Sequence, residues 1–381
     1  MSKVVLGIER ISEFESLFKG KRVGLITNPS GIDSNYVASA DIIAEKATLK
    51  ALFAPEHGVR GDIQAGVKLD SYKDPKTGVI VHSLYGNTRR PTKEMFEDLD
   101  IIAYDIHDAG ARFYTYPFTM AYCMEAAKEY NKEFVVFDRP NPVGGEKVEG
   151  NILDMNFRSF IGYYPITQRY GLTIGEMAKL FNEEYGIGCK LTVVPMKGWQ
   201  RSMDFEDTGL PWVFLSPNLP TNDSSYAFLA TCIFEGTNIS EGRGTTKPFQ
   251  IVGAPFINPE LLAEKLNELK LPGVHFRSLY FTPTFSKHQN ALCGGVEMYV
   301  LDRKKFEPVR TGWNMLYMIR KLYPKEFEVN KPYVEGKPCM LDYNTGSDYM
   351  KNDIYTIKEL EVILSKESKE FDQIRKKYLL Y

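Results

Sequence analysis

The order of segments in the first third of the chain constrains the fold most, because apolar runs typical of strands alternate there with segments of helical spacing. That order indicates βαβ crossovers and a parallel sheet. The strand-like runs are nearly all apolar, as expected when helices cover both faces. The expected strands lie in residues 21–31, 48–58, 79–86, 100–110 and 133–145, and the expected helices in residues 39–47, 91–99 and 119–131.

The first expected strand ends in "TNPSG", which lacks the G-x-G-x-x-G of a dinucleotide site. No G-x-x-x-x-G-K-[ST] sequence occurs elsewhere in the chain. We therefore expect a sheet that is Rossmann-like in shape only, with no cofactor.

Polar clusters follow four of the expected strands. They are "TNPSG", "PEHGVRG", "DIHDAGARFYTYP" and "DRPNP". In an open parallel sheet, ligands bind beyond the carboxyl ends of the strands. These four segments are therefore expected to converge on one crevice, which makes their side chains candidates for a functional site.

The regular alternation of strands and helices ends at about residue 155. "LTIGEMAKLFNEEYG" predicts an amphipathic helix, with Thr173 and Glu176 at the spacing of a capping box. Strands and helices then mix with many Pro and Gly residues, which suggests an α+β unit. With 381 residues the chain is also too long for one ordinary core. We expect a Rossmann-like α/β catalytic domain at 1–155 and an α+β domain at 156–381 that closes a substrate pocket, with the active crevice between them.

Charge and cysteine usage exclude several classes of protein. Lys plus Arg number 47 and Asp plus Glu 49, so the net charge of −2 gives no reason to expect nucleic acid as a partner. The five cysteines are scattered and form no CxxC, so neither disulfides nor a thiolate metal site is expected. No membrane span and no export signal is visible, so the chain as written is expected to be cytoplasmic; the alternative is an exported form whose signal was removed. The oligomeric state is not predicted.

Six segments together resemble the exo-β-N-acetylmuramidase family, long catalogued as a domain of unknown function. They are "APEHGVRG", "DIHDAGARFYTY", "DRPNPVGG", "LSPNLPT", "FEGTNISEGRGTTKPF" and "GAPFI", and they occur in the family's order over residues 5 to 380. The resemblance implies a Rossmann-like domain followed by an α+β domain. It also implies hydrolytic release of terminal β-1,4-linked N-acetylmuramic acid from the non-reducing end of peptidoglycan fragments.

The resemblance further implies that Glu56, in "PEHG", is the principal catalytic carboxylate. One departure is visible in "ITQRYGLTIGE", where this chain has Tyr170 at a position at which the family usually has a histidine. If that histidine contacts the sugar or its lactyl carboxylate, the substrate preference of this chain differs.

The residue types are also suited to glycoside cleavage without reference to the family. This reaction usually needs two carboxyl groups, and the expected strand ends carry several. We predict Glu56, Asp105 and His57 as catalytic residues. Asp108, Asp138, Glu235 and Glu241 are alternative carboxyls, and the sequence does not pair them. An acetamido group of the substrate can also act as the nucleophile.

The remaining candidates are predicted to bind substrate. Arginines suit the lactyl carboxylate and tyrosines suit a sugar ring, although the same side chains equally serve ion pairs and packing. The predicted binding residues are Asn28, Arg60, Asp108, Arg112, Tyr114, Tyr116, Asp138, Arg169, Glu235 and Arg243. A sugar substrate of the MurNAc–GlcNAc type is the expected partner.

Two other functions stay open at this stage. One is a metal-dependent hydrolase built from strand-end Asp and His residues, although no H-E-x-x-H or H-x-H spacing supports it. The residues it would use are His57, Asp105, His107, Asp108 and Asp138. The other is a glycan-binding module without catalysis, which would need the aromatic and arginine residues but no ionisable acid.

Overall fold

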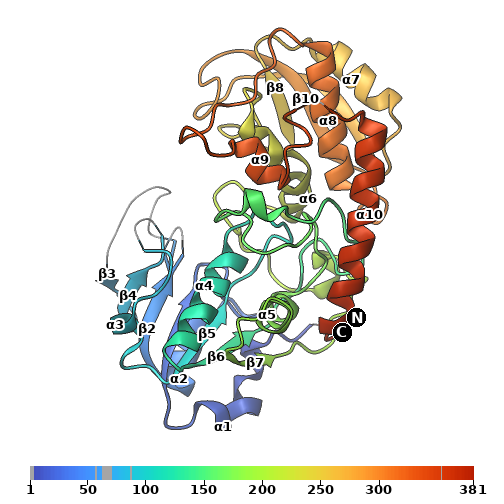
Figure 1. The fold of residues 1–381 in the computed structure, drawn as a ribbon. Coiled ribbons are helices and arrows are strands. Elements are labelled where there is room, and N and C mark those ends of the chain that lie inside the picture. The colour runs from blue at the N-terminus through green and yellow to red at the C-terminus, as the bar shows by residue number, and fades with distance from the viewer. Residues whose placement is uncertain (1–3, 56–57, 62–70, 86–87, 353) are drawn as a thin grey trace.

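The computed structural model describes residues 4–55, 58–61, 71–85, 88–352 and 354–381. Figure 1 shows two parts, a large sheet with its helices below and a smaller sheet with its helices above. The predicted fold class, a Rossmann-like α/β domain joined to an α+β domain, is confirmed.

The large sheet has seven strands in the order β3-β4-β2-β1-β5-β6-β7. All pairs are parallel except β3 with β4. The strand order reverses at β1, which lies between β2 and β5, and ligands of such sheets bind at this reversal. The strands are β1 (Arg22–Thr27), β2 (Thr48–Ala54), β3 (Ser71–Lys73), β4 (Ile80–Ser83), β5 (Ile101–Asp105), β6 (Glu133–Phe137) and β7 (Lys190–Val194).

Helices cover both faces of this sheet, as the apolar strands predict. α4 and α5 pack together on β5, β6 and β7, whereas α2 packs on β1, β2 and η1. Strand side chains alternate accordingly, with Phe53 and Tyr104 in one buried cluster and Leu52 and Ala103 in another. The elements are η1 (Ile8–Phe14), α1 (Glu15–Phe18), α2 (Ser39–Lys46), α3 (Lys93–Phe96), α4 (Tyr116–Glu129) and α5 (Ile174–Glu183).

The first sheet extends beyond residue 155, the predicted domain boundary. α5 lies against β6 and β7, and β7 is the last strand of the sheet. Thr173 and Glu176 form the predicted capping box at the start of α5. The large sheet therefore ends only at Val194, because a strand far along the chain adds to its edge.

The second part contains an antiparallel sheet in the order β8-β10-β9. α7 packs on β9 and β10, and α8 packs on α6 and α7. Its elements are α6 (Asn222–Thr231), β8 (Ile251–Ala254), α7 (Pro259–Glu268), β9 (Val274–Phe281), β10 (Cys293–Val300), α8 (Pro308–Leu322), α9 (Met340–Thr345) and α10 (Ile357–Arg375). Short 3-10 turns complete the chain at η2 (Met155–Phe157), η3 (Phe205–Thr208), η4 (Cys232–Gly236) and η5 (Lys376–Tyr378).

The two ends of the described chain lie side by side, since α10 runs back from the upper part to the lower part (Figure 1). Val5 pairs with Lys197, and the Tyr381 ring lies 5.2 Å from the Trp199 ring, measured between centroids. One cluster of buried hydrophobic side chains also extends through both parts. The two parts are therefore joined by a shared core as well as by the chain.

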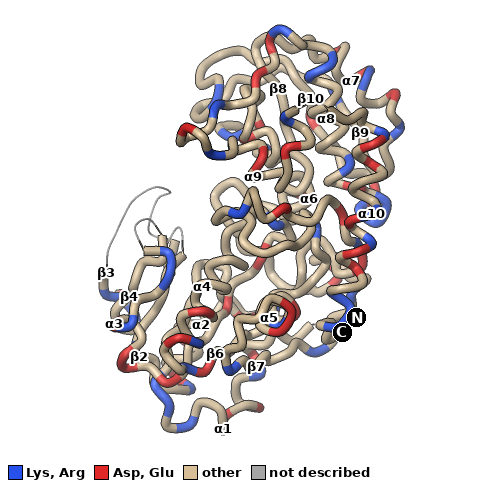
Figure 2. Tube along the Cα trace, in the orientation of Figure 1, with Lys and Arg blue, Asp and Glu red and all other residues tan. Residues whose placement is uncertain are grey.

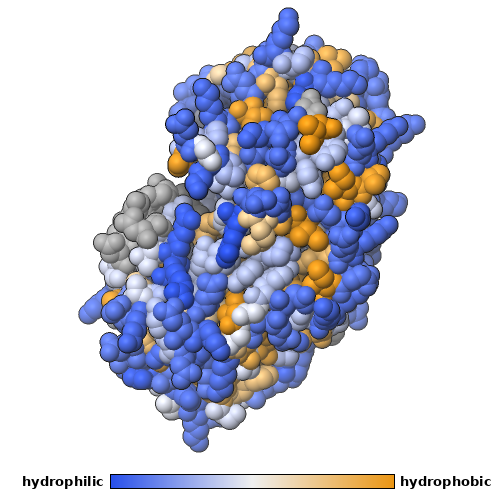
Figure 3. All heavy atoms as spheres, in the orientation of Figure 1, coloured by the Kyte–Doolittle hydropathy of each residue, from blue (hydrophilic) through white to orange (hydrophobic). Residues whose placement is uncertain are grey.

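Charged residues of both signs are spread over both parts (Figure 2), in keeping with a net charge of −2. On the face in Figure 3, hydrophobic residues form small groups among hydrophilic ones. All five cysteines are free and buried. In the described part of the chain, no helix is long and apolar enough to span a membrane.

Candidate active site

The site is built around the ends of β1 and β5, where the order of the large sheet reverses. Thr27 and Asp105 are register partners at the ends of these strands. The Arg139 guanidinium, just after β6, donates to both Asp105 carboxylate oxygens, at 2.6 and 2.7 Å. Ser39 donates to the same carboxylate. Asp105 is fully buried, so this bidentate pair fixes the strand ends relative to one another.

The turn after β1 holds the segment after β5 in place. The Asn28 side-chain oxygen accepts from the Ser30 backbone N–H at 3.0 Å and from its hydroxyl at 2.6 Å. The Ser30 hydroxyl in turn accepts from the backbone N–H of His107 at 3.0 Å. Asn28 is buried, and its side-chain oxygen shapes this turn. Its predicted contact with substrate stays a prediction.

His107 is buried between two aromatic rings, with Phe205 at 5.0 Å and Trp212 at 5.7 Å between centroids. Burial and the nearby Arg139 guanidinium lower the pKa of His107 to about 3, so its imidazole is neutral at pH 7. Its Nε2 atom has no hydrogen-bond partner within the described part of the chain. His107 is thus a neutral, buried group beside the Asp105–Arg139 pair.

Asp108 follows the same strand as Asp105 but lies in a different electrostatic environment. Its Oδ2 atom accepts from the Tyr170 hydroxyl and, at 3.2 Å, from the Gly110 N–H. Oδ1 is buried and has no partner among the described residues. Burial raises the pKa of Asp108 to about 7, although the N–H groups of Ala109 and Gly110 oppose the shift. Asp108 is therefore a carboxyl that changes charge near neutral pH.

Tyr170 occupies the position at which the resemblance leads us to expect a histidine, and its ring is fully buried. The Tyr170 hydroxyl donates to Asp108, and tyrosine is not a group that ordinarily changes charge near pH 7. A histidine would titrate in that range. The departure seen in the sequence therefore lies in direct contact with Asp108, a carboxyl with a pKa near neutral pH.

Tyr114 and Tyr116 link the strand ends to the second part of the molecule. Their rings lie 4.6 Å apart between centroids, and the Tyr114 hydroxyl donates to the Leu215 carbonyl at 2.8 Å. Tyr114 also packs on Phe228 of α6. Phe228 in turn contacts Phe249, over whose ring the Arg243 guanidinium lies at 5.0 Å. Both tyrosines are buried packing residues here, and their contact with a sugar stays a prediction.

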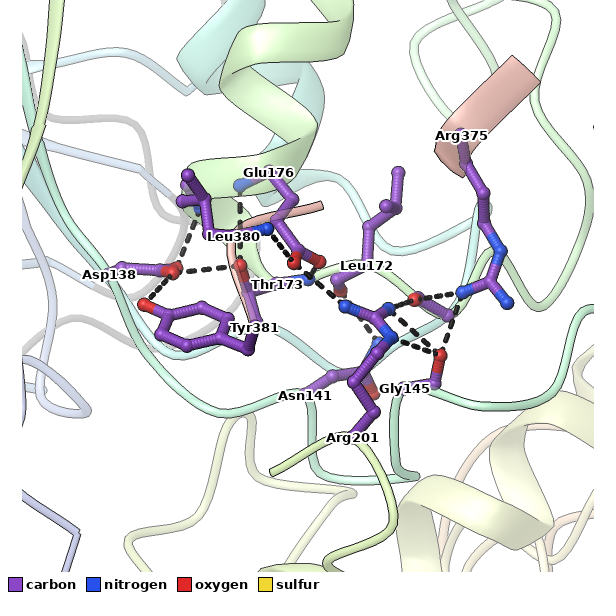
Figure 4. Close-up of polar contacts among 12 residues, drawn as sticks. Asp138, Asn141, Gly145, Leu172, Thr173, Glu176, Arg201, Arg375, Leu380 and Tyr381 are labelled. Carbon is purple, nitrogen blue, oxygen red and sulfur yellow. Dashed lines mark hydrogen bonds and ion pairs between the residues drawn. The ribbon is translucent and has the colours of Figure 1, made fainter. Parts of the chain in front are cut away.

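Asp138 accepts hydrogen bonds from four donors, three of which lie in other segments (Figure 4). They are the Arg139 N–H at 2.9 Å, the Thr173 hydroxyl at 2.8 Å, the Gly175 N–H at 2.7 Å and the Tyr381 hydroxyl at 2.7 Å. Burial raises the pKa of Asp138 to about 7 despite these bonds. The carboxyl has no oxygen left for a sugar in this arrangement. It anchors the start of α5 and the end of the described chain to the loop after β6.

The same loop is clamped further along by two arginines. The Gly145 carbonyl accepts from Arg201 at 2.8 Å and from Arg375 at 2.7 Å (Figure 4). Arg201 also pairs with the buried Glu176 carboxylate at 2.7 Å. The loop that carries Arg139 is therefore fixed by residues from α5, from the segment after β7 and from α10.

Glu56 and His57 lie outside the described residues, so their predicted catalytic roles remain predictions. The residues on either side, Pro55 and Gly58, are buried. A Cβ atom added to Gly61 would lie 3.0 Å from the Pro29 ring, so this segment packs on the turn after β1. The described flanks of "PEHG" thus lie at the same sheet edge as Asn28 and Asp105.

Two of the four predicted anion-binding arginines, Arg60 and Arg112, are held by protein groups, although the buried Nε atom of Arg112 has no partner among the described residues. Arg60 uses all three guanidinium nitrogens on Asp41 and Asp74, at 2.9 to 3.4 Å. Arg112 is completely buried, and burial lowers its pKa to about 9. Its two terminal nitrogens donate to the carbonyls of Asn151, Ile166, Asn344 and Thr345. Both side chains serve structural contacts in this arrangement.

Arg169 is buried and pairs with Glu149 at 2.5 Å and with the Val143 carbonyl. It borders a polar cavity of about 870 Å³ between the two parts, together with Tyr226 and Arg303. Acidic and basic side chains are nearly balanced around this cavity, and Arg303 is paired with three carboxylates there. None of the described acids at the ends of β1 and β5 borders it.

Arg243 differs from the other three arginines. Its side chain is 30% exposed, with Nη2 on the Glu235 carboxylate and Nε 3.1 Å from the Glu241 carboxylate. Nη1 has no hydrogen-bond partner within the described ranges. Burial opposes its charge, but the two carboxylates raise its pKa overall. Lys287 completes the cluster by donating to Glu241 at 2.8 Å. Of the predicted arginines, this one is placed to meet a further anion.

Several residues of the site escaped the sequence analysis. Arg139 stands beside Asp138 in "DRPNP", and its pairing with Asp105 joins residues 34 positions apart. Ser39 and Lys287 lie in no motif singled out beforehand. Of these three residues, only Arg139 could have been found from the sequence, because it follows a predicted strand. The contacts of Ser39 and Lys287 depend on how distant segments pack.

Among the described residues, no group of three His, Cys, Asp or Glu side chains is arranged to hold a metal ion. Asp105 and Asp138, two of the ligands considered for a metal-dependent hydrolase, are instead bound by arginine, hydroxyl and N–H donors. The described geometry therefore gives the metal alternative no support of its own.

Two family models match most of the chain. The model described as exo-beta-N-acetylmuramidase NamZ, N-terminal, matches residues 23–223, and its C-terminal counterpart matches residues 226–381. The chain belongs to the exo-β-N-acetylmuramidase NamZ family. The predicted family and the predicted enzyme class, a glycosidase, are confirmed. The two NamZ models meet between residues 223 and 226, after the end of the large sheet.

Individual relatives agree with NamZ membership. The peptidoglycan β-N-acetylmuramidase NamZ of Bacillus subtilis strain 168 is 52% identical, covering 100% of this chain and 92% of that protein. The crystal structure of a DUF1343 family protein from Bacteroides fragilis NCTC 9343 has a TM-score of 0.92 at 38% identity, covering 100% of this chain and 99% of that one. A second DUF1343 structure from that strain has a TM-score of 0.79 at 30% identity, with the same coverage.

Proposed function

We propose that this chain is an exo-acting glycoside hydrolase that removes terminal β-1,4-linked N-acetylmuramic acid from the non-reducing end of peptidoglycan fragments. The observation that carries the proposal is the 52% identity, over the whole chain, to a peptidoglycan β-N-acetylmuramidase. The family models extend the same assignment over both parts of the molecule. Membership of this family favours a glycosidase over a metal-dependent hydrolase or a glycan-binding module.

The geometry supports a role for Arg243 in recognising the sugar. N-acetylmuramic acid differs from N-acetylglucosamine by a lactyl ether that carries a carboxylate. A partly desolvated carboxylate is bound well by a guanidinium. Arg60, Arg112 and Arg169 are bound to protein partners, and the Nε atoms that Arg112 and Arg169 leave without a described partner are buried. Arg243 is part-exposed, and its Nη1 atom has no partner among the described residues. We therefore assign the lactyl carboxylate to Arg243.

The predicted acids differ in how well they suit proton transfer. Glu56 stays the proposed principal catalytic carboxyl, on the strength of the "PEHG" motif. Asp105 is bound in a bidentate pair with Arg139, which suits orientation of the strand ends better than proton transfer. Asp108 has a pKa of about 7 and one oxygen without a partner in the described chain, so it is the better second carboxyl. A group with that pKa exchanges a proton readily at neutral pH.

The test is product analysis on two disaccharides of opposite order. With N-acetylmuramic acid at the non-reducing end and N-acetylglucosamine at the reducing end, we expect both free sugars. With the order reversed, we expect no cleavage. Cleavage of the reversed disaccharide, or none of either, contradicts the proposal. Activity that EDTA abolishes and zinc or magnesium restores would instead favour the metal-dependent alternative, and sugar binding without turnover would favour the glycan-binding one.

A further inference from the structure

The loop of residues 283–290, between β9 and β10, has an unusual backbone. Ser286, His288 and Asn290 have positive φ angles of 69°, 57° and 62°. Residues other than glycine adopt such angles at a cost in free energy, and they persist where the surrounding structure fixes them. Strained backbone of this kind is concentrated at functional sites. The contacts of the loop identify the segment that holds it in this conformation.

The loop is joined to the "SEGRGTT" segment that carries Arg243. The Thr284 N–H and hydroxyl both donate to the Gly244 carbonyl, at 2.9 and 3.0 Å. The His288 ring nitrogen lies 2.6 Å from the Asn238 carbonyl. A Cβ atom at Gly244, whose φ is 82°, would lie 2.5 Å from the Phe285 carbonyl oxygen. Such close contact leaves no room for the two segments to move independently.

Lys287 is the charged member of the loop and points toward this segment. Its ammonium donates to the carbonyls of Phe234 and Ile239, at 2.6 and 2.8 Å, and to Glu241 Oε2 at 2.8 Å. These three bonds account for all three ammonium protons. The ammonium is thus directed by the backbone as well as by Glu241.

Glu241 lies between two cations and is only 2% exposed. Its Oε2 atom accepts from Lys287, and its Oε1 atom lies 3.1 Å from Arg243 Nε. Glu235 binds the other side of Arg243. The four side chains together have no net charge, with two carboxylates and two cations. Without Lys287 the cluster would have one excess negative charge, and it would repel an anion approaching Arg243.

We propose that Lys287 is a positioning residue that lets Arg243 bind the carboxylate of the terminal sugar. The inference rests on the proposed function, in which Arg243 recognises N-acetylmuramic acid. Lys287 acts through Glu241: it neutralises that carboxylate and holds it in place, so that the guanidinium keeps both its orientation and an effective positive charge. It is not proposed to touch the substrate.

The experiment measures inhibition of the full-length enzyme by free N-acetylmuramic acid and by N-acetylglucosamine. We expect Lys287→Met to weaken inhibition by N-acetylmuramic acid about tenfold, equal to about 1.4 kcal/mol, and to leave inhibition by N-acetylglucosamine unchanged. Lys287→Arg should retain most of the wild-type preference. Lys247→Met is the matched control, because Lys247 also pairs with a buried carboxylate, that of Glu297, but has no contact with Arg243 in the described structure.

The double variant Lys287→Met/Glu241→Gln separates charge from simple loss of structure. It removes one cation and one anion, so the cluster returns to zero net charge. We expect it to bind N-acetylmuramic acid more tightly than Lys287→Met alone, an interaction between neighbours that a double-mutant cycle measures. If Lys287→Met does not fold, the comparison of Lys287→Arg and Glu241→Gln with the wild type serves instead, with Glu241→Gln expected to bind the acid sugar at least as tightly as the wild type.

Equal weakening for both sugars, or no rescue in the double variant, would overturn the inference and leave Lys287 a structural residue. If Arg243→Met preserves the preference for N-acetylmuramic acid, the assignment of Arg243 fails and this inference fails with it. Failure of the proposed function looks different, since the wild type would then cleave neither disaccharide, or would cleave the reversed one.

Discussion

Asp105 and Asp108 show how the environment of a residue decides its chemistry. They lie three positions apart at the end of β5, and both are buried. Asp105 has the Arg139 guanidinium against both of its oxygens, whereas the partners of Asp108 in the described structure are a tyrosine hydroxyl and backbone N–H groups. A buried carboxyl without a cation is easier to protonate. Two aspartates from one motif thus have different roles.

Replacing Asp108 with asparagine tests its raised pKa. Because the folded chain holds the Asp108 proton up to a pH of about 7 and the unfolded chain loses it near 4, the free energy of unfolding falls as pH rises through this window. The asparagine side chain does not titrate, so it cannot contribute this slope. Urea unfolding at several pH values should therefore show a shallower decline in the Asp108→Asn variant. Asp138 is present in both proteins, so parallel curves would show that the Asp108 pKa is not raised.

Glu56 is tested by Glu56→Gln, which keeps the shape and removes the acid. A general acid or base contributes about 10²–10⁴ in rate, so we expect kcat on an unactivated disaccharide to fall by about that factor. The melting temperature should change little. A variant that keeps more than about a third of the wild-type kcat would exclude Glu56 as the proton-transfer group.

Arg243 is tested by Arg243→Met against Arg60→Met. Because Arg243 is part-exposed and its Nη1 atom has no partner among the described residues, Arg243→Met should raise KM for an N-acetylmuramic acid substrate about tenfold or more, as expected for a lost charge-assisted hydrogen bond. Arg60→Met should mainly lower stability, because it removes the cation paired with Asp74 and one of the two cations paired with Asp41. The assignment would be wrong if the two variants changed KM equally.

At the scale of elements, the loop after β6 is the common support of the site. Its Arg139 binds Asp105, and its Asp138 binds the first turn of α5 and Tyr381. Arg201 and Arg375 hold the same loop at Gly145. Segments from widely separated parts of the sequence therefore fix one loop, which keeps the strand-end carboxyls in register with each other.

Replacing Tyr381 with Phe tests this support. The Tyr381 hydroxyl donates to Asp138 and accepts from the Met196 N–H, both at 2.7 Å. Phe removes both bonds, which should cost about 1–3 kcal/mol in the free energy of unfolding. Denaturant unfolding near pH 7 measures the loss. Tyr333→Phe, at an 83% exposed site, is the control and should be neutral. Equal stabilities of the two variants would contradict the support role.

At the scale of the whole molecule, the second part covers the strand-end edge of the first. Tyr114 reaches Leu215 and Phe228, and Arg112 binds the carbonyls of Asn344 and Thr345, which lie more than 230 positions away. A site between two parts of a molecule suits a pocket that holds one terminal sugar. An enzyme that cuts inside a glycan chain needs an open groove instead.

Exo-action is tested by following the digestion of a long, unsubstituted glycan chain. We expect single N-acetylmuramic acid residues from the first minutes, while the mean chain length falls slowly. Release should stop when N-acetylglucosamine becomes the terminal sugar. A rapid early fall in chain length would show internal cleavage and contradict the pocket. An added enzyme that removes terminal N-acetylglucosamine should restart release.

The sequence by itself determined most of the parallel sheet, and it predicted the sheet edge at which the site lies. Alternating apolar strands and helices define β1, β2, β4, β5 and β6, whereas β3 was not predicted. Polar residues at the strand ends mark the edge where such sheets bind ligands. The family motifs that contain "PEHG", "DIHD" and "SEGRG" were likewise recognisable in the sequence. These features are local, since each depends on residues close together in the chain.

Only the tertiary structure decided which charged groups are occupied and which are open. The sequence offered four equivalent arginines, and the fold places Arg112 among carbonyls, Arg60 between two aspartates and Arg243 at a part-exposed position. It also pairs Asp105 with a cation, whereas no described cation pairs with Asp108. The charge state of such a side chain, and whether it is free to bind a ligand, depend on burial and on partners distant in sequence. A local sequence pattern contains neither kind of information.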